Sequence, residues 1–560
     1  MFHQERRRRG HACATAAVVI VLVATGCASG GADETDDDGT IVVYTGQAED
    51  YQVNFNPYSP NAIEGPGTIF EPLFYYNLVA PDDPLPRLGT EFSWNDEGTE
   101  LSITLRDDAT WSDGENVTAE DVVFTLDMVV ENTAMNSTGY AGEAEAVSDT
   151  EVVVTFDEPS FMQEPEILGR FWIVPEHIWS EFDDPETNVV EEPIGSGPFT
   201  LAEFQPQVFT LEANSDYWDG EPDLPAIRYL ALAGNQSGAD ALSQGTIDWQ
   251  TGPVPDIHNV EENYPGYKSI TVPMNQIALF TCSNEELGCE GPQTDVNVRH
   301  AVHLAMNRTQ LNTLAFEDTA SEMSPGFALP ERDEHLLSAE MESDIVPMEP
   351  HADTATELLE ESGYTLGDDG VYERDGERLS MTVTVVSGWT DYITAVDTMT
   401  QQVEEAGIEL IAEQVSWNEW SDMRGQGEYE LLIDALHQGP APDPYYLYSY
   451  FFATENTAEV GEVANPNFAR YSNPDVDQAL VELEQLPGDD LEARQPHYDT
   501  IQVALEQDMP YVPVLTGGTT SQYNAERFDG WPEEDDLYAF PAVWGRPDAS
   551  QIFLNLAPTG

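Results

Sequence analysis

The cysteines are the residues of this chain whose type and spacing most directly suggest chemistry. Cys282 and Cys289 close the short loop CSNEELGC, whereas Cys13 and Cys27 lie near the N-terminus. A metal site at this loop would need more ligands than the neighbouring sequence offers. In an exported protein, an isolated pair that closes a short loop is typical of a disulfide. We therefore predict a Cys282–Cys289 disulfide and no bound metal.

Catalytic motifs are missing from the sequence. It contains no H-E-x-x-H, no G-x-S-x-G and no phosphate-binding P-loop. Pairs of carboxylates, which glycoside hydrolysis requires, occur everywhere by chance because the chain has 105 Asp and Glu residues. We therefore expect a binding protein with no catalytic residue and no cofactor, in preference to a secreted hydrolase.

The N-terminus has the pattern of an export signal. Arg6 to Arg9 are followed by the apolar run ATAAVVIVLVA at 14–24, which is too short to span a bilayer. The segment VATGC at 23–27 resembles a bacterial lipobox, in which cleavage before the cysteine leaves a lipidated N-terminus. We predict a lipoprotein signal peptide at 1–26, lipidation of Cys27 and an acidic tether at 27–39. A plain signal peptide with an incidental cysteine is the alternative.

The charge of the chain excludes some partners. Its 105 acidic and 19 basic residues give a formal charge of −86, and Lys268 is the single lysine. Such a surface repels nucleic acids and anionic lipid headgroups. Because the acids are spread along the whole chain, they indicate a global surface property, for which we expect a halophilic, high-salt environment. Apolar residues make up 41% of the chain, which is enough for a substantial core.

The pattern along the chain predicts mixed α and β structure. A capping box at 118–121 precedes an apolar-periodic helix at 122–130, and Asp375-Gly376 predicts a hairpin turn within 371–386. A helix at about 392–406 is followed by strands at 408–411 and 431–435 with a helical stretch between them. Strands that alternate with helices favour an α/β fold.

Several segments, in order along the chain, resemble one protein family. They are LPRL at 85–88 with Trp94, WSDG at 111–114, TAEDV at 118–122, IVPEHI at 173–178, GSGPF at 195–199, NSDYW at 214–218, GTIDW at 245–249, ATELLEESGY at 355–364 and RYSNP at 470–474. Together they resemble the extracellular solute-binding proteins of bacterial ABC importers, in the dipeptide- and oligopeptide-binding class (family 5). The resemblance extends over most of residues 40–545.

The resemblance implies a two-lobed α/β periplasmic-binding-protein fold that closes on a ligand. Lobe I would comprise residues 40–272 and a C-terminal return at 511–560, with an extra subdomain at about 80–190. Lobe II would comprise residues 273–510. Two strands would cross between the lobes, for which 272–280 and 510–514 are suitable apolar segments. The implied partners are a small oligomeric solute, an ABC permease and ATPase, and the outer face of the cell membrane through the lipid anchor.

The resemblance also indicates where a peptide would be anchored. Peptide-binding members of the family hold the N-terminal amine with an Asp that lies three residues before an Asp/Glu-Pro pair. The matching pair in this chain is Asp443-Pro444. Pro440 occupies the anchor position, and proline has no charge to offer an ammonium group. Either Asp443 takes the role, or the ligand lacks an amine. Peptides are therefore the expected cargo, and a neutral oligosaccharide is the alternative.

Aromatic and amide side chains complete the expected binding site. Aromatic rings can stack on sugars or line peptide pockets, and amides can bond a peptide backbone or a hydroxyl. Burial in the core and capping of loops are the alternatives. The expected ligand contacts are Asp443, Tyr445, Tyr446, Trp389, Trp249, Asn275, Gln276 and Asn54.

Overall fold

The computed structural model describes residues 39–47, 50–59, 61–81, 83–132, 135–136, 139–464 and 466–559. The predicted signal peptide, Cys27 and nearly all of the tether lie outside these residues. Gly39–Gly560 forms one compact unit. Among the described residues, no helix combines the length and apolarity needed to cross a membrane.

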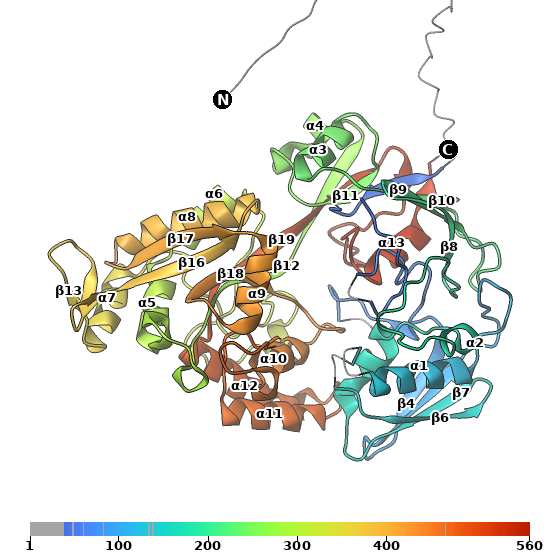
Figure 1. The fold of residues 1–560 in the computed structure, drawn as a ribbon, viewed down its shortest axis with the longest axis horizontal. Helices are drawn as coiled ribbons and strands as arrows, with labels where there is room; N and C mark the ends of the chain where they lie inside the picture. Colours follow the sequence, from blue (N-terminus) through green and yellow to red (C-terminus); the bar gives the residue numbers. More distant parts are fainter. Residues whose placement is uncertain are drawn as a thin grey trace, which may run out of the picture. The chain divides into compact units, whose positions relative to one another are not determined.

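A ten-stranded mixed sheet runs through this unit, in the order β17-β16-β18-β12-β19-β11-β1-β10-β9-β8. At its centre, β12 (Tyr267–Thr281) and β19 (Tyr511–Asn524) pair antiparallel over most of their length. Figure 1 shows these two strands running from the β16–β18 group to the group that contains β11. They occupy the positions of the two predicted crossover segments. Each is longer than predicted, because apolar and β-branched residues continue beyond the proline-bounded stretches. We keep the names lobe I and lobe II with the ranges given above.

Lobe I contributes the β11-to-β8 half of the sheet. Runs such as IVVY in β1 are buried on both faces, as in parallel sheets covered by other elements, and β1 pairs parallel with β10 and β11. The elements are β1 (Ile41–Tyr44), β8 (Phe199–Gln205), β9 (Val208–Ala213), β10 (Ala226–Leu230), β11 (Trp249–Thr251), α3 (Asn235–Ser243), α4 (Val260–Asn263) and α13 (Asp548–Asn555). Two short pairs accompany them, namely β2 (Phe74–Tyr75) with β3 (Leu85–Pro86), and β20 (Phe528–Asp529) with β21 (Ala557–Pro558).

The expected extra subdomain contains a separate antiparallel sheet in the order β4-β5-β7-β6. Its alternating strands bury one face against α1, where the amide of Thr118 donates to the Asp121 carboxylate as the capping box predicts. The elements are β4 (Gly89–Trp94), β5 (Glu100–Leu105), β6 (Glu143–Ser148), β7 (Glu151–Thr155), α1 (Ala119–Glu131) and α2 (Glu176–Trp179).

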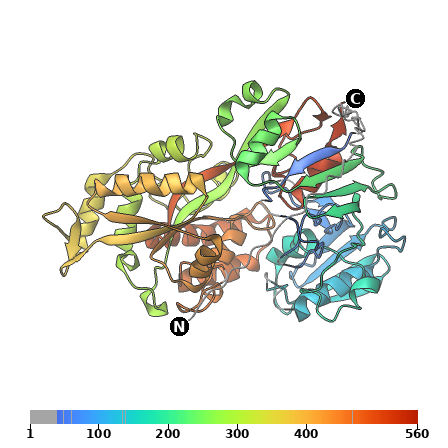
Figure 2. The same ribbon diagram turned by 45° about the horizontal axis from the view of Figure 1, so that its top comes forward.

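Lobe II contributes the other end of the large sheet, covered by helices on both faces (Figure 2). Strand β16 pairs parallel with both β17 and β18. On one face lie α5 (Val296–Ala305), α6 (Arg308–Ala315), α7 (Ala352–Glu361) and α8 (Thr390–Glu404). On the other lie α9 (Trp417–Gln426), α10 (Pro444–Phe452), α11 (Pro474–Glu484) and α12 (Leu491–Asp508). The strands are β16 (Ser380–Val386), β17 (Glu409–Val415) and β18 (Leu431–Leu436).

The hairpin predicted at 371–386 is confirmed in part. Asp375 and Gly376 both have positive φ and join β14 (Tyr372–Arg374) to β15 (Glu377–Arg378), while β13 (Thr365–Leu366) pairs with β14. The second half of the predicted hairpin is instead β16 of the large sheet. Its apolar side chains are buried there, which a small exposed hairpin would not provide.

Candidate functional site

The candidate site lies where parallel strands of both lobes end. In α/β sheets, the carboxyl ends of parallel strands are the preferred place for ligands. The segment after β11 in lobe I and the segment after β16 in lobe II line the same cavity, which has a volume of about 390 Å³. Gly517 to Thr520 of β19, together with Asn275 and Ile277 of β12, form its floor. A ligand in this cavity would contact both lobes at once.

The lining is rich in hydroxyls and aromatic rings. Lobe II contributes Phe316 and Tyr392, and lobe I contributes Trp544, which is 41% exposed. Asn275 donates to the hydroxyl of Thr519 at 3.1 Å. The lining threonines are Thr251, Thr319, Thr390, Thr394, Thr519 and Thr520. The cavity therefore offers many neutral hydrogen-bonding groups beside flat apolar surfaces, which suit a polar organic solute.

Aromatic rings form a wall at the start of α8. Tyr392 packs edge-to-face on Trp389, with ring centroids 5.5 Å apart, and Trp389 packs on Trp420 at 5.2 Å. The predicted residue Trp389 is half-buried and lies two residues from Asp391, which lines the cavity. Among the aromatic residues predicted to bind ligand, Trp389 is the one that the structure places next to this cavity.

A cluster of polar side chains forms a second contact between the two lobes. Arg170 of lobe I donates to the Tyr450 hydroxyl at 2.6 Å, and that hydroxyl donates to Glu166. The ring of His437, directly after β18, packs against Tyr450 and Phe451. Part of the His437 side chain is exposed, but the surrounding protein atoms disfavour its charged form and lower its pKa to about 4. The positive charges of Arg170 and Arg424 lower the pKa further. His437 is therefore neutral near pH 7.

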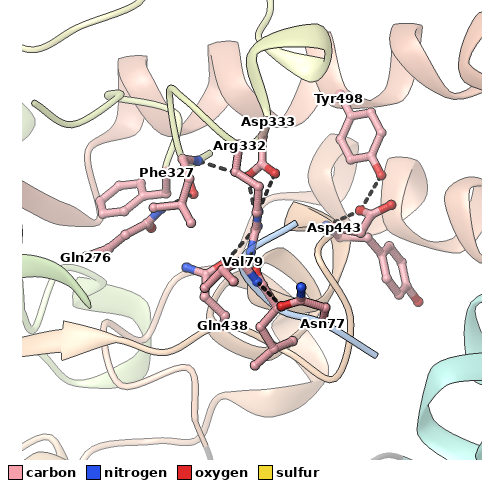
Figure 3. A network of polar contacts seen from close by, with 12 residues as sticks. Asn77, Val79, Gln276, Phe327, Arg332, Asp333, Gln438, Asp443 and Tyr498 are labelled. Atoms are coloured by element: carbon pink, nitrogen blue, oxygen red, sulfur yellow. Dashed lines mark hydrogen bonds and ion pairs between the residues drawn. The ribbon is translucent and has the colours of Figure 1, made fainter. Parts of the chain in front are cut away.

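A third contact between the lobes is centred on Arg332 (Figure 3). Its guanidinium forms two hydrogen bonds with Asp333, at 2.6 and 2.9 Å. It also donates to the Leu78 carbonyl of lobe I at 3.1 Å and to the side chain of Gln438 at 2.9 Å. The loop that follows β18 is thereby fixed to lobe I. Sequence reasoning missed Arg332 because nothing near it in the chain indicates these partners.

The structure assigns Asp443 a structural environment. Its carboxylate accepts the Tyr445 amide at 2.8 Å as the N-cap of α10, and the Tyr498 hydroxyl at 2.6 Å. It also forms an ion pair with Arg494 at 2.8 Å, and Figure 3 shows Tyr498 pointing at it. Three partners within the protein thus already hold this carboxylate, and the role of Asp443 as the amine anchor stays a prediction.

Tyr445 and Tyr446 also differ from the prediction. Both are buried in the first turn of α10, and the Tyr446 hydroxyl donates to the Met162 carbonyl of lobe I at 3.0 Å. Gly439, in the loop after β18, has no room for a side chain because Tyr446 packs against it. The two tyrosines therefore stabilise the α10 region and its contact with lobe I instead of lining the cavity.

Three further predicted contacts are structural. Trp249 is 1% exposed and packs against Trp531 and Phe553 in the core of lobe I. Asn54 caps a loop, because its side-chain oxygen accepts the amides of Asn56 and Val190. Gln276 is fully buried and donates to the Phe327 carbonyl at 2.9 Å. Their partners come from segments distant in the chain, so the sequence near each residue does not reveal its burial.

Cys282 and Cys289 form a disulfide, the pairing that their spacing predicts, with Cα atoms 5.4 Å apart. It lies at the end of β12, away from the residues that line the cavity. Within the described ranges, no group of three or more His, Cys, Asp or Glu side chains is placed to hold a metal ion.

Two lobes joined by two long crossover strands, with a cavity lined by both, define a periplasmic-type binding protein. The profile of the bacterial extracellular solute-binding proteins, family 5 (middle region), matches residues 83–458. The chain belongs to this family, which serves ABC importers. Its members bind solutes for transport on the outer side of the cell membrane, so this chain is a substrate-binding protein and not an enzyme.

Individual relatives are distant but cover nearly the whole chain. The oligopeptide-binding protein AppA of Bacillus subtilis is 24% identical over 500 residues, covering 85% of this chain and 87% of AppA. The mannohexaose-bound oligopeptide-binding protein of Thermotoga maritima superposes with a TM-score of 0.80 at 22% identity, covering 94% and 99%. NikZ of Campylobacter jejuni in complex with Ni(L-His) gives 0.74 at 18% identity, covering 91% and 99%. The two structures establish the two-lobed α/β fold.

Proposed function

We propose that this protein is the lipid-anchored, exported substrate-binding component of an ABC importer that captures short peptides. The two lobes close around the peptide, and the loaded protein delivers it to a membrane permease whose ATPase subunits supply the energy. The observation that carries this proposal is the cavity at the strand ends, because both lobes line it and a bound solute would stabilise their contact.

The class of cargo rests on the family and on the cavity lining. AppA, which covers most of the chain in sequence, is named for oligopeptide binding. Asn275 and six threonines give the cavity a polar lining for the backbone of a peptide, although most of these hydroxyls also bond within the protein, and Phe316, Tyr392 and Trp544 line it for the side chains. These contacts would favour short, uncharged or cationic peptides.

A neutral oligosaccharide is the second candidate, and a specific observation favours it. Pro440 cannot bind an amine, and Asp443 already has Arg494, Tyr498 and the Tyr445 amide as partners. The related Thermotoga maritima protein was solved with mannohexaose bound. Hydroxyls beside aromatic rings are also the groups that recognise sugars.

The experiment that separates these candidates is ligand-induced thermal stabilisation in high-salt buffer. A ligand present at 100 times its Kd adds about 2.7 kcal/mol to the folded state, which raises the melting temperature measurably. Stabilisation by di- to pentapeptides supports the proposal. Stabilisation by oligosaccharides alone would replace the cargo class, and stabilisation by neither would reject both, with nickel–histidine chelates tested next.

The lipid anchor is tested separately. We expect that Cys27→Ser releases the protein from the membrane fraction, because an unmodified serine cannot carry the lipid. Membrane association that persists in this variant would reject lipidation at Cys27. A Cys13→Ser variant is the matched control, since Cys13 lies within the predicted signal peptide.

A further inference from the structure

The cavity between the lobes is acidic. Its lining includes the carboxylates of Glu317 and Asp391, and none of the described residues that line it is Lys, Arg or His. Charged groups partly surrounded by protein interact more strongly than they would in bulk water. An anionic solute would therefore be repelled, whereas a neutral or cationic solute would be accepted.

Asp391, one of the two carboxylates in this lining, has surroundings that change its pKa. It lies in the first turn of α8, where the backbone N–H groups of Tyr392 and of Asp391 itself favour its charged form. Burial raises its pKa, and none of the ion pairs formed by the described residues includes Asp391. A charged carboxylate in this position is incompletely compensated, so a cationic group of a ligand would stabilise it.

Other buried or half-buried aspartates among the described residues have side-chain partners. Asp121 and Asp548 accept hydrogen bonds from the neutral hydroxyls of Thr118 and Tyr75, and several others pair with an arginine. Asp434 lies on the neighbouring strand β18 and pairs with Arg424 at 2.6 Å. Further pairs are Asp248 with Arg527, Asp333 with Arg332, and Asp443 with Arg494. Asp391 lines the cavity, and the described residues provide it with no such partner. This contrast identifies it as a carboxylate whose partner could be supplied by the ligand.

The rings around Asp391 are also suited to a cation. Tyr392 follows it directly and lies between Phe316, at a centroid distance of 6.3 Å, and Trp389 at 5.5 Å. Trp544 lines the same cavity from lobe I. Aromatic faces attract ammonium groups through the ring quadrupole, and the attraction increases where water is excluded.

We propose that Asp391 binds the terminal ammonium group of the peptide, at a position in the fold different from the one that Pro440 occupies. The proposal rests on the proposed peptide-binding function. Lobe II would hold the amine at the start of α8, and Trp544 of lobe I would approach the same group when the lobes close. The amine then acts as a bridge between the lobes.

The test measures binding of tetra-alanine and of N-acetyl-tetra-alanine by calorimetry in high-salt buffer. We expect acetylation to weaken binding to the unaltered protein by about 10- to 100-fold, the range for a hydrogen bond to a charged group. Asp391→Asn should weaken binding of the free peptide by a similar factor and leave binding of the acetylated peptide unchanged. Glu317→Gln is the matched control, because it removes the same charge from the same cavity, and it should change the affinity by less than about 3-fold.

Each contrary outcome has a defined meaning. If tetra-alanine binds but neither acetylation nor Asp391→Asn affects its affinity, the assignment of Asp391 is wrong and the peptide-binding function stands. Equal losses in Asp391→Asn and Glu317→Gln would indicate a general field effect and also reject the assignment. If mannohexaose binds and tetra-alanine does not, the peptide-binding function fails and the amine anchor fails with it. If Asp391→Asn is unstable, Asp391→Ser serves as the second variant, and an acetylation effect of unchanged size in it rejects the assignment.

Discussion

Two segments of lobe II differ in a way that the sequence does not reveal. The loop after β18 leads to Asp443, and the turn after the adjacent strand β16 leads to Asp391. Both aspartates lie at the start of a helix, at the same end of one sheet. Asp443 has an arginine, a tyrosine and a backbone amide as partners, whereas Asp391 lines the cavity and has no ion-pair partner within the part of the chain that the structure describes.

The difference shows that the position of a carboxylate relative to a strand end does not by itself define a ligand contact. Where the fold supplies a buried cation, the carboxylate stabilises the protein. Asp391 lines the cavity and forms no ion pair with a described arginine, so it is the carboxylate that we propose for ligand binding. The sequence resemblance draws attention to Asp443, and the tertiary contacts lead us to propose Asp391 for the expected role instead.

The largest effect should come from removing the partner of Asp443. Arg494 is 1% exposed and Asp443 is 17% exposed, so Arg494→Met leaves a buried charge unpaired. We expect the free energy of unfolding to fall by about 3–5 kcal/mol. Urea denaturation measures this loss, and the double variant Asp443→Asn/Arg494→Met should recover part of it. A loss below about 1 kcal/mol would show that this ion pair does not stabilise the protein as the comparison requires.

A second test uses Glu164, a carboxylate bonded to the neutral donors Tyr76 and Trp94 at 3.2 and 3.0 Å. Burial raises its pKa from 4.5 to about 7. Between these values the folded protein binds more protons than the unfolded chain, so stability should fall as pH rises from about 5 to 7, by up to about 3 kcal/mol. Glu164→Gln should flatten this dependence in pH-resolved unfolding.

The matched control is Glu143→Gln on the exposed edge of β6, which should leave the pH dependence unchanged. If Glu164→Gln leaves the slope as steep as in the unaltered protein, Glu164 is charged in the fold at pH 7. The distinction between carboxylates with and without a cation partner would then lose its electrostatic basis.

Asp443→Asn should lower the free energy of unfolding more than Asp391→Asn does. Asp443→Asn keeps a helix cap but leaves Arg494 unpaired, so stability should fall by about 1–3 kcal/mol. Asp391→Asn removes a carboxylate whose burial offsets its favourable place at a helix N-terminus, so the change should stay within about 1 kcal/mol. Chemical unfolding of both variants in one buffer checks the order, and the reverse order would contradict the comparison.

The smallest effect is expected at Trp544. Trp544→Ala should weaken tetra-alanine binding by about 2- to 5-fold, as expected for an exposed ring beside a cation, and leave the melting temperature nearly unchanged. Trp417→Ala is the control, because this tryptophan is 55% exposed on α9 and does not line the cavity. Equal affinities of the two variants would place the amine away from Trp544.

Much of the local structure could be predicted because it depends on neighbouring residues. The capping box at 118–121 and the Asp375-Gly376 turn are confirmed, and the α/β class follows from strands that alternate with helices. The ordered motifs also identified the family, which the profile match confirms. The lobe boundaries and the lipidated Cys27 stay predictions. The sequence alone also determined the charge of −86, because counting requires no fold.

Only the tertiary structure decided which side chains are available to a ligand. Trp249 and Trp389 are both tryptophans beside strand ends, but the first is covered by Trp531 and Phe553, which lie hundreds of residues away. Asp443 forms an ion pair with Arg494, which lies on a later helix, α12. Among the described residues, no arginine forms an ion pair with Asp391. Burial and pairing depend on which distant segments the sheet brings together, and this information is not contained in the sequence near either residue.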